Sequence, residues 1–302
     1  MGKVRLKAHK RKLPVPFLLF ATLPTAFLLV VFMIVPTVQA LLMSFQEVDM
    51  LTMEGTFAGL KNFAYLLKDR MFVLSFQNTL KLIIVIPLIT LSVSFVLAFV
   101  LQQFRLREKD LYIKFYFFPY FLSTAVVAIV WSFVLHPTSG IVNKVLGAVG
   151  LDSLQHAWVG EEGTALWCIA AVIIWASIGY YLVLYLSGLD SIPQDVYEAA
   201  TLDGAGFWGK LIHITLPLMK NIIGTTFILL MSGVIGISFV YSNLLTNGGP
   251  NGASSVLMQY VFVQGIRNGN TGYASAITVV AMTMGILLSA ISRKLTNKSE
   301  KE

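Results

Sequence analysis

Six apolar stretches divide the chain, and polar segments separate them. A bilayer core about 30 Å thick takes roughly 20 apolar residues in helical form, and each stretch comes close to or exceeds that length without one charged residue. The predicted spans are residues 13–43, 82–104, 115–135, 164–188, 222–243 and 273–291. This pattern predicts an all-α integral membrane fold with six transmembrane helices in one domain, residues 13–291.

A further apolar stretch, residues 253–266, is too short to cross a bilayer. The preceding segment 247–252 reads NGGPNG, and its Asn, Gly and Pro residues are typical of turns. We therefore expect an external loop followed by a short interfacial or re-entrant helix.

Composition agrees with a membrane protein. Charged residues make up 12% of the chain and hydrophobic residues 56%, whereas soluble domains carry about a quarter charged residues. The one cysteine, Cys168, lies in an apolar run and is expected to be a packing residue. It excludes a disulfide framework or a cysteine-rich metal site within this chain.

The basic residues give the predicted topology a direction. A net charge of +7 can indicate nucleic-acid binding, but six of the 22 Lys and Arg residues precede the first span. With a cytoplasmic basic N-terminus (1–12) and tail (292–302), internal segments hold 16 Lys and Arg and external segments five. This asymmetry follows the positive-inside rule, so we expect both termini in the cytoplasm and no nucleic-acid partner.

One internal stretch, residues 203–211 (DGAGFWGKL), resembles two nucleotide-binding fingerprints. Its glycines fit G-x-G-x-x-G, and Gly204 to Lys210 fit all but the last position of a P-loop. Both fingerprints need a preceding strand within a parallel sheet, whereas the preceding residues read as helix. Leu211 also stands where a P-loop has its Ser or Thr magnesium ligand. The sequence therefore predicts no nucleotide site, and no cofactor held by this chain.

The same internal loop, residues 189–220, carries its own helix signals. Ser191 and Gln194 are spaced as a capping box at the start of a helix. Pro193 and Asp195 are typical of a first helical turn. Gly204 is typical of the residue that ends a helix. The expected helix places Ile192, Val196, Ala199 and Ala200 on one face. A second short helix is expected from Phe207 until Pro217.

A resemblance to a known family emerges from the spacing within this loop. Glu198-Ala199-Ala200, then Gly204, Ile214 and Leu216-Pro217, resemble the EAA loop of ABC importer permeases. Supporting pieces lie along most of the chain and include Asn78-Thr79-Leu80, Phe118-Pro119-Tyr120, "LTNGGP" (245–250) and "YASA" (273–276). The chain is similar in particular to the carbohydrate-type permeases, the group of maltose, oligosaccharide and glycerol-3-phosphate importers.

The resemblance implies partners and a role for the loop. Such a permease pairs with a second related permease, two ATPase subunits that hold ATP-Mg, and an external solute-binding protein, in the prokaryotic cytoplasmic membrane. The first short helix of the loop is then a coupling helix that docks on the ATPase. The residues implied in coupling are Glu198, Ala199, Ala200, Asp203, Gly204, Ile214, Leu216 and Pro217.

The spans contain no Asp or Glu, which self-powered symporters usually carry near the midplane. This absence favours energy supplied from outside the chain, although backbone carbonyls also bind sodium. A stand-alone secondary carrier or channel for a small neutral solute stays open as the alternative. A membrane-anchored structural protein is a third class. Such a protein would not need the spacing of Glu198, Gly204 and Pro217 in the internal loop.

A neutral, hydroxyl-rich solute would use aromatic faces and uncharged polar groups. The residues themselves offer Tyr120, Trp175, Tyr180 and Tyr181 as candidates, and the family pattern adds Val234, Ile235 and Ser238. The opposing interpretation is that such aromatics form interfacial belts and that serines ease helix packing. Some sugar permeases of this family have asparagines where Ile235 and Ser238 stand, so the sugar, polyol or glycerol phosphate stays unidentified.

No catalytic or metal site is expected. His136 and His156 share a predicted external loop with Glu161 and Glu162, but 20 residues separate the two histidines, which is not compact ligand spacing. No arrangement of a nucleophile with a base, and no carboxylate pair, is readable in the chain. The sequence therefore predicts a transport subunit rather than an enzyme.

Overall fold

A computed structural model describes residues 15–48, 55–104 and 107–298. The predicted basic segment 1–12 and the last four residues of the predicted tail lie outside these ranges. Nearly every described element is helical. The elements are α1 (Val15–Leu29), η1 (Val30–Ile34), α2 (Val35–Met43), β1 (Gln46–Val48), β2 (Gly55–Phe57), α3 (Lys61–Leu66), α4 (Arg70–Gln103), α5 (Lys109–Phe121), α6 (Thr124–Val134), α7 (Ile141–Ala148), η2 (Asp152–Leu154), α8 (Ala165–Asp190), α9 (Gln194–Leu202), α10 (Phe207–Lys210), η3 (Leu211–Thr215), α11 (Leu216–Tyr241), η4 (Ser242–Thr246), α12 (Leu257–Phe262), η5 (Val263–Arg267) and α13 (Thr271–Lys298).

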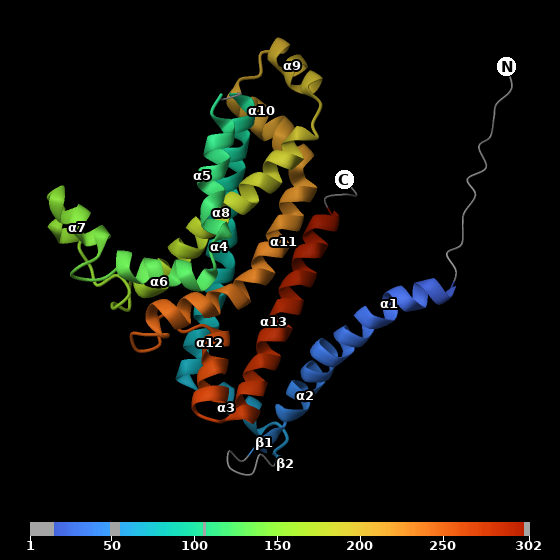
Figure 1. Cartoon of the computed structure of the whole chain (residues 1–302), viewed down its shortest axis with the longest axis vertical. Coiled ribbons are helices and arrows are strands. Elements are labelled where there is room, and N and C mark those ends of the chain that lie inside the picture. Colours follow the sequence, from blue (N-terminus) through green and yellow to red (C-terminus); the bar gives the residue numbers. More distant parts are fainter. Residues whose placement is uncertain (1–14, 49–54, 105–106, 299–302) are drawn as a thin grey trace.

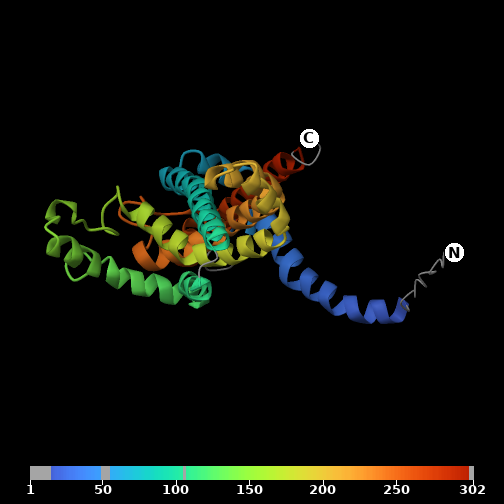
Figure 2. The ribbon, with the colours of Figure 1, turned by 90° about the horizontal axis from the view of Figure 1, so that it is seen from above.

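The long helices α4, α8, α11 and α13 form one bundle (Figure 1). Helix α9 lies across one end of it, where α13 also ends, and α3 lies at the opposite end with the antiparallel β1–β2 hairpin. Helices α6 and α7 project sideways, and α1 extends away from the bundle (Figure 2). The two ends of the bundle therefore carry different structures.

The number of membrane-crossing helices agrees with the prediction. Five described helices are long and apolar enough to cross a bilayer, and the pair α5 and α6 makes six if it counts as one bent span. This pair corresponds to the expected span 115–135, and its two helices meet at 98°. The bend occurs because Leu122 and Ser123 adopt extended backbone angles between them.

Two helices run beyond their expected limits. Helix α4 begins at Arg70 rather than near residue 82, because Asp69 caps it and accepts hydrogen bonds from the N–H groups of Met71 and Phe72 at 2.9 and 3.4 Å. The helix that starts at Phe207 does not stop at Pro217. The π-helical segment η3 precedes this proline and continues into α11, since a local π turn accommodates the missing proline N–H.

The predicted capping box in the internal loop is wrong. Helix α9 begins after Pro193 without a side-chain cap, because the Ser191 hydroxyl donates instead to the carbonyl of Gly188 at 2.6 Å. The expected short helix after the 247–252 turn is confirmed as α12.

Helices α5 and α8 approach closely at one glycine. A Cβ on Gly179 would overlap the carbonyl oxygen of Tyr116 and the backbone of Phe117. One residue earlier, the carbonyl of Ile178 accepts a hydrogen bond of 2.9 Å from the Ser94 hydroxyl of α4. The absence of a side chain at Gly179 therefore sets the position of α5, and through it the predicted solute-path residue Tyr120.

Helix α4 also holds the irregular segment that precedes α12. The side-chain N–H groups of Asn78 donate to the carbonyls of Gly252, Ala253 and Ser255 at 3.3, 2.9 and 3.0 Å. The Thr79 hydroxyl accepts the N–H of Leu257 at 2.9 Å. These backbone groups lie beside an apolar bundle, and α4 gives them the hydrogen bonds that water would otherwise supply.

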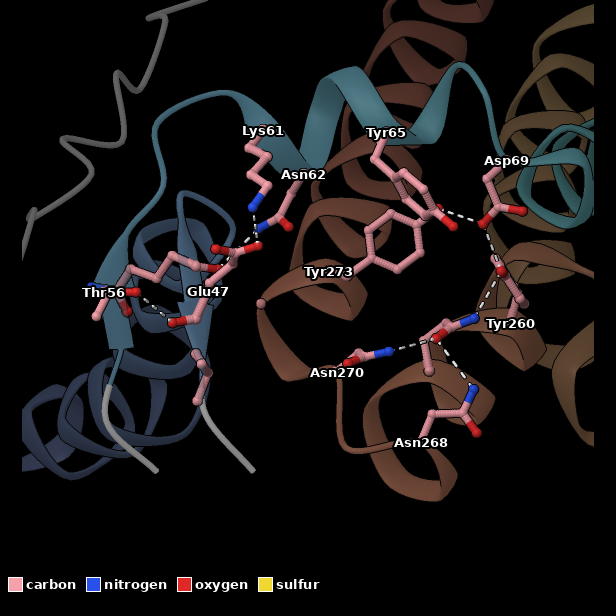
Figure 3. A pocket seen from close by; sticks show the side chains of 14 residues that line it. Glu47, Thr56, Lys61, Asn62, Tyr65, Asp69, Tyr260, Asn268, Asn270 and Tyr273 are labelled. Carbon is pink, nitrogen blue, oxygen red and sulfur yellow. Dashed lines mark hydrogen bonds and ion pairs between the residues drawn. The ribbon is translucent and has the colours of Figure 1, made fainter. Parts of the chain in front are cut away.

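A single carboxylate joins three elements near α3. The Oδ2 atom of Asp69 accepts hydrogen bonds from the hydroxyls of Tyr260 in α12 and Tyr273 in α13 at 2.6 and 2.5 Å (Figure 3). Burial raises the pKa of Asp69, but these two hydroxyls and the cap N–H groups together hold it below its ordinary value. The carboxylate therefore stays ionised at neutral pH and ties α4 to both helices.

We expect Gly179→Ala to lower the free energy of unfolding by about 1–3 kcal/mol, because the new methyl group meets backbone that cannot move aside. Gly233→Ala in α11 is the matched control. Its Cβ would meet nothing within 4 Å, and helix propensity predicts a gain of about 0.5–1 kcal/mol. Thermal unfolding of the full chain in detergent measures both. Equal effects of the two substitutions would contradict the close approach.

We expect Asp69→Asn to reduce stability by about 1–3 kcal/mol at neutral pH, since one strong acceptor is lost. The native pKa lies below the unfolded value of about 3.9, so the stabilisation is complete above that value and is lost as the pH falls through the native pKa. The difference in melting temperature between wild type and Asp69→Asn should be constant from pH 8 to 5 and shrink below about pH 4. Asp152→Asn, on the distant η2 turn, serves as the control. A difference that changed between pH 8 and 5 would refute the assignment.

Candidate functional site

Helix α9 presents two different faces. Tyr197 and Ala200 turn toward the chain, where the Tyr197 hydroxyl lies 3.0 Å from Thr215 Oγ1 and Ala200 is buried. Glu198 and Ala199 are exposed on the other face. Of the expected apolar face, Ala200 is buried and Ile192 half-buried, whereas Val196 and Ala199 are exposed. The bond from Tyr197 sets this rotation of the helix.

The exposed face has a sequence spacing of i, i+3, i+4 and i+7. It consists of Asp195, Glu198, Ala199 and Leu202, and we call it the α9 stripe. Leu202 is 90% exposed at the end of the helix, although a leucine gains free energy by burial. Leu202 was not among the predicted site residues. Its position four residues after Glu198, on the same helix face, was the signal that could have identified it.

The turn after α9 depends on Gly204. Its φ is +80°, which a residue with a Cβ rarely adopts, and no other described residue would obstruct a Cβ there. This backbone angle confirms the predicted stop. Asp203 beside it is exposed, so the turn and the α9 stripe form one continuous free surface.

The remaining predicted coupling residues lie where the loop joins α11. Ile214 is half-buried in η3, and Leu216 and Pro217 are exposed in the first turn of α11. The Thr215 hydroxyl donates to the Lys210 carbonyl at 3.0 Å as well as contacting Tyr197. These contacts connect α9 to α11 through η3.

Lys210 is a buried cation that the sequence analysis missed. It is 8% exposed and makes no ion pair within the described residues. It lines a cavity of about 280 Å³ together with Gln194 and Glu198 of α9 and Gln102 of α4. The neighbouring sequence "GKLI" gives no signal that Lys210 is buried, because residues distant in sequence cover its side chain.

Three of the predicted solute-path aromatics form one group. Tyr120 of α5 stacks on Tyr180 of α8 with ring centroids 4.6 Å apart, and Tyr180 meets Tyr181 edge-on at 5.1 Å. Tyr120 is exposed, whereas Tyr181 is buried. Trp175 lies in another pair, with its ring centroid 5.4 Å from that of Trp131 in α6.

The predicted residues of α11 are mostly covered. Val234 and Ser238 are each 0% exposed, and the Ser238 hydroxyl donates to the carbonyl of Ile235 at 3.3 Å. Ile235 is half-buried. In this conformation the chain itself covers Val234 and Ser238, so a solute would reach them only after the helices rearrange.

The loop histidines show no ligand set. Within residues 15–48, 55–104 and 107–298, no group of three or more His, Cys, Asp or Glu side chains could hold a metal ion. His156 Nδ1 lies 3.0 Å from Glu161 Oε2. The N–H of Ala157 and the ring of His156 hold the pKa of Glu161 below its ordinary value, which is a local loop contact.

Comparison with known proteins places these features in a family context. The family model described as "binding-protein-dependent transport system inner membrane component" matches residues 113–300. This range contains the α9 stripe, the Gly204 turn and the aromatic group. It covers more than half of the chain.

Relatives match over nearly the whole chain. A probable ABC transporter permease protein, YurN, of Bacillus subtilis is 31% identical over 92% of this chain and 95% of its own length. The diacetylchitobiose uptake system permease protein NgcF of Streptomyces coelicolor is 30% identical over 91% of this chain and 80% of its own. In the crystal structure of a bacterial alginate ABC transporter with an alginate pentasaccharide-bound periplasmic protein, one chain matches with a TM-score of 0.80 at 22% identity, over 93% of this chain and 94% of that one.

We expect Gly204→Ala to loosen the turn after α9, because alanine destabilises a positive φ by about 1 kcal/mol or more. Amide hydrogen exchange over residues 194–202 should then become faster. Gly206→Ala is the matched control, since Gly206 is equally exposed, has equal space and has a φ of −72°. Similar exchange in the two variants would show that the backbone angle at Gly204 does not hold α9.

Proposed function

The chain belongs to the family of binding-protein-dependent transport system inner membrane components, and from this membership we propose that it is a permease subunit of an ATP-driven importer. Its helices would form half of a membrane pathway, and a second related permease would form the other half. Two ATPase subunits would bind and hydrolyse ATP-Mg. This family membership disfavours a stand-alone carrier or channel.

The α9 stripe is the observation that carries the proposal. It exposes Ala199 and Leu202 between the carboxylates of Asp195 and Glu198, and the chain itself leaves this apolar surface uncovered. A soluble partner that buried Leu202 would gain about 1.5–3 kcal/mol from that side chain, and a basic group could pair with Glu198. This composition supports α9 as the element that docks on the ATPase.

The membrane orientation follows from the same element. Helix α9 lies at the end of the bundle where α4 ends, α5 begins and α13 ends (Figure 1). Those connections belong to segments 105–114, 189–220 and 292–302, which carry ten Lys and Arg residues against five in the predicted external segments, so we place this end in the cytoplasm. The end with α3, α12 and the hairpin then faces outward, toward a solute-binding protein.

The mechanism we propose is alternating access. When the ATPase subunits close on ATP, they would move α9, and the bond from Tyr197 to Thr215 would transmit that movement through η3 to α11. Val234 and Ser238 of α11, which are covered now, would be uncovered by such a rearrangement. Leu211 stands where a nucleotide site would need a magnesium ligand, so ATP chemistry is assigned to the partner.

The proposed solute is a sugar or oligosaccharide. The diacetylchitobiose system of Streptomyces coelicolor and the alginate transporter carry saccharide names. The exposed, stacked ring of Tyr120 offers an aromatic face of the kind that sugars contact. We accordingly assign Tyr120, Tyr180, Tyr181 and Trp175 to the solute path.

Purification of the tagged chain from its own host in mild detergent, followed by mass spectrometry, tests this function. We expect a P-loop ATPase and a second six-span chain to co-purify in stable amounts. A clean homo-oligomer, unchanged by Glu198→Ala, would overturn the importer assignment and restore the carrier or channel.

We expect Leu202→Ala to weaken ATPase retention about 10- to 100-fold, because a docking leucine loses its apolar contacts. Binding of the purified ATPase to the full-length permease pair measures this. Leu67→Ala is the matched control, since Leu67 is 81% exposed at the opposite end of the bundle. Equal retention by both variants would show that Leu202 does not dock.

A further inference from the structure

A polar cavity of about 930 Å³ opens at the end of the bundle opposite α9 (Figure 3). It lies between α3, the β1–β2 hairpin, α12, η5 and the start of α13. None of the predicted coupling or solute-path residues lines it. Its size falls in the range of roughly 300–1,000 Å³ that is usual for small-molecule sites.

Five side-chain amides line this cavity, and bonds to neighbours hold four of them in place. Asn62 donates to the carbonyls of Ser44 and Gln46 at 3.0 and 2.9 Å. The Oε1 atom of Gln264 accepts from both Asn268 and Asn270 at 3.3 Å. The amide oxygens of Asn268 and Asn270 accept no hydrogen bond from other described residues, and both side chains are exposed. They are available to a ligand that donates hydrogen bonds.

An aromatic ring stands beside these amides. Tyr65 is 57% exposed, and its ring meets Tyr273 edge-on with centroids 5.2 Å apart. Helix α3 carries Tyr65, and Figure 3 shows its ring beside that of Tyr273, with Asn268 and Asn270 across the same cavity. An accessible ring face next to fixed amides suits a molecule with an apolar C–H face and hydroxyl edges.

Each charged side chain among the described lining residues already has a partner within the chain. Lys61 and Glu47 form an ion pair of 2.6 Å at its edge. The Asp69 carboxylate accepts two tyrosine hydroxyls and two backbone N–H groups. Among the described lining residues, no unpaired cation is available to a phosphorylated or carboxylated solute, and the ionised Asp69 would repel one.

We propose that the polar cavity is a binding site for a neutral saccharide, with Tyr65 as the stacking platform and Asn268 and Asn270 as hydroxyl acceptors. The outward location of the site rests on the proposed function, because that function sets the orientation of the bundle. The site is separate from the solute path, and it would hold a saccharide at the entrance before the molecule reaches Tyr120 and Tyr180.

Isothermal titration of the full-length chain in detergent, without partner proteins, tests the cavity directly. The probes are maltose and diacetylchitobiose as neutral disaccharides and sn-glycerol 3-phosphate as a charged solute. We expect saturable binding of at least one disaccharide and none of the phosphate. Tyr65→Ala, and separately the double variant Asn268→Ala/Asn270→Ala, should each weaken that binding about tenfold, as expected for loss of one stacking contact or of two hydrogen bonds.

Matched controls at the opposite end of the bundle are Tyr112→Ala and Asn221→Ala, which replace exposed residues of the same types. They should leave binding unchanged. Absence of disaccharide binding, equal binding by the cavity variants, or binding of the phosphate at similar strength would overturn the proposal. Cavity variants that lose a solute-binding protein but keep the disaccharide would also overturn it and assign the cavity to that protein.

These outcomes are independent of the test for the importer. A chain that co-purifies with an ATPase but binds no disaccharide in the cavity would keep the proposed function and lose this site. A chain that binds a disaccharide through Tyr65 but co-purifies with no ATPase would keep the site and lose the importer.

Discussion

The requirement that buried backbone polar groups find partners shapes this molecule most. Regular helices meet it within themselves, but the segment between η4 and α12 does not. Helix α4 supplies what is missing through Asn78, whose amide reaches three carbonyls of that segment. Without these bonds, α12 would lose its fixed position against α4, and Tyr260 would lose its position at Asp69. The architecture of one whole end of the bundle therefore depends on a few polar residues in an otherwise apolar helix.

Polar bonds between distant elements fix both ends of the bundle. At one end, the bond between Tyr197 and Thr215 joins α9 to the base of α11. At the other end, Asp69 joins α4 to α12 and α13. Both are polar bonds between elements far apart in sequence, placed where the helices leave the apolar region.

Much of the fold could be predicted from local patterns. Uncharged runs located the long helices, the NGGPNG turn located α12, and Gly204 marked the end of α9, because each of these signals lies within a few residues of its effect. The rotation of α9 could not be predicted this way. It is set by Tyr197 meeting Thr215, 18 residues away. The break at Leu122 and Ser123 was also missed, since these residues are as apolar or as small as many that continue a helix.

The polar cavity shows the same limit more strongly. Its walls come from residues near 47, 62 and 268, which no spacing rule connects. Tyr260 and Tyr273 lie more than 190 residues from Asp69, and each resembles an ordinary interfacial tyrosine in sequence. The site residues that the family resemblance implied lie at the opposite end of the bundle and in its interior, so they did not point to this cavity. A cavity between loops therefore needed three-dimensional structure to be recognised.

The position of α1 away from the bundle determines what solvates this helix. The span Thr22–Met43 has no buried residues, and Phe27 and Phe32 are 65% and 73% exposed. In water such a surface would drive aggregation, but acyl chains solvate it as well as another helix would. When a neighbouring subunit replaces those lipids, little hydrophobic transfer energy is gained, and shape complementarity and lipid release decide the balance. A copy whose α1 contacts only lipid would therefore be stable in the bilayer before the proposed second permease packs against it.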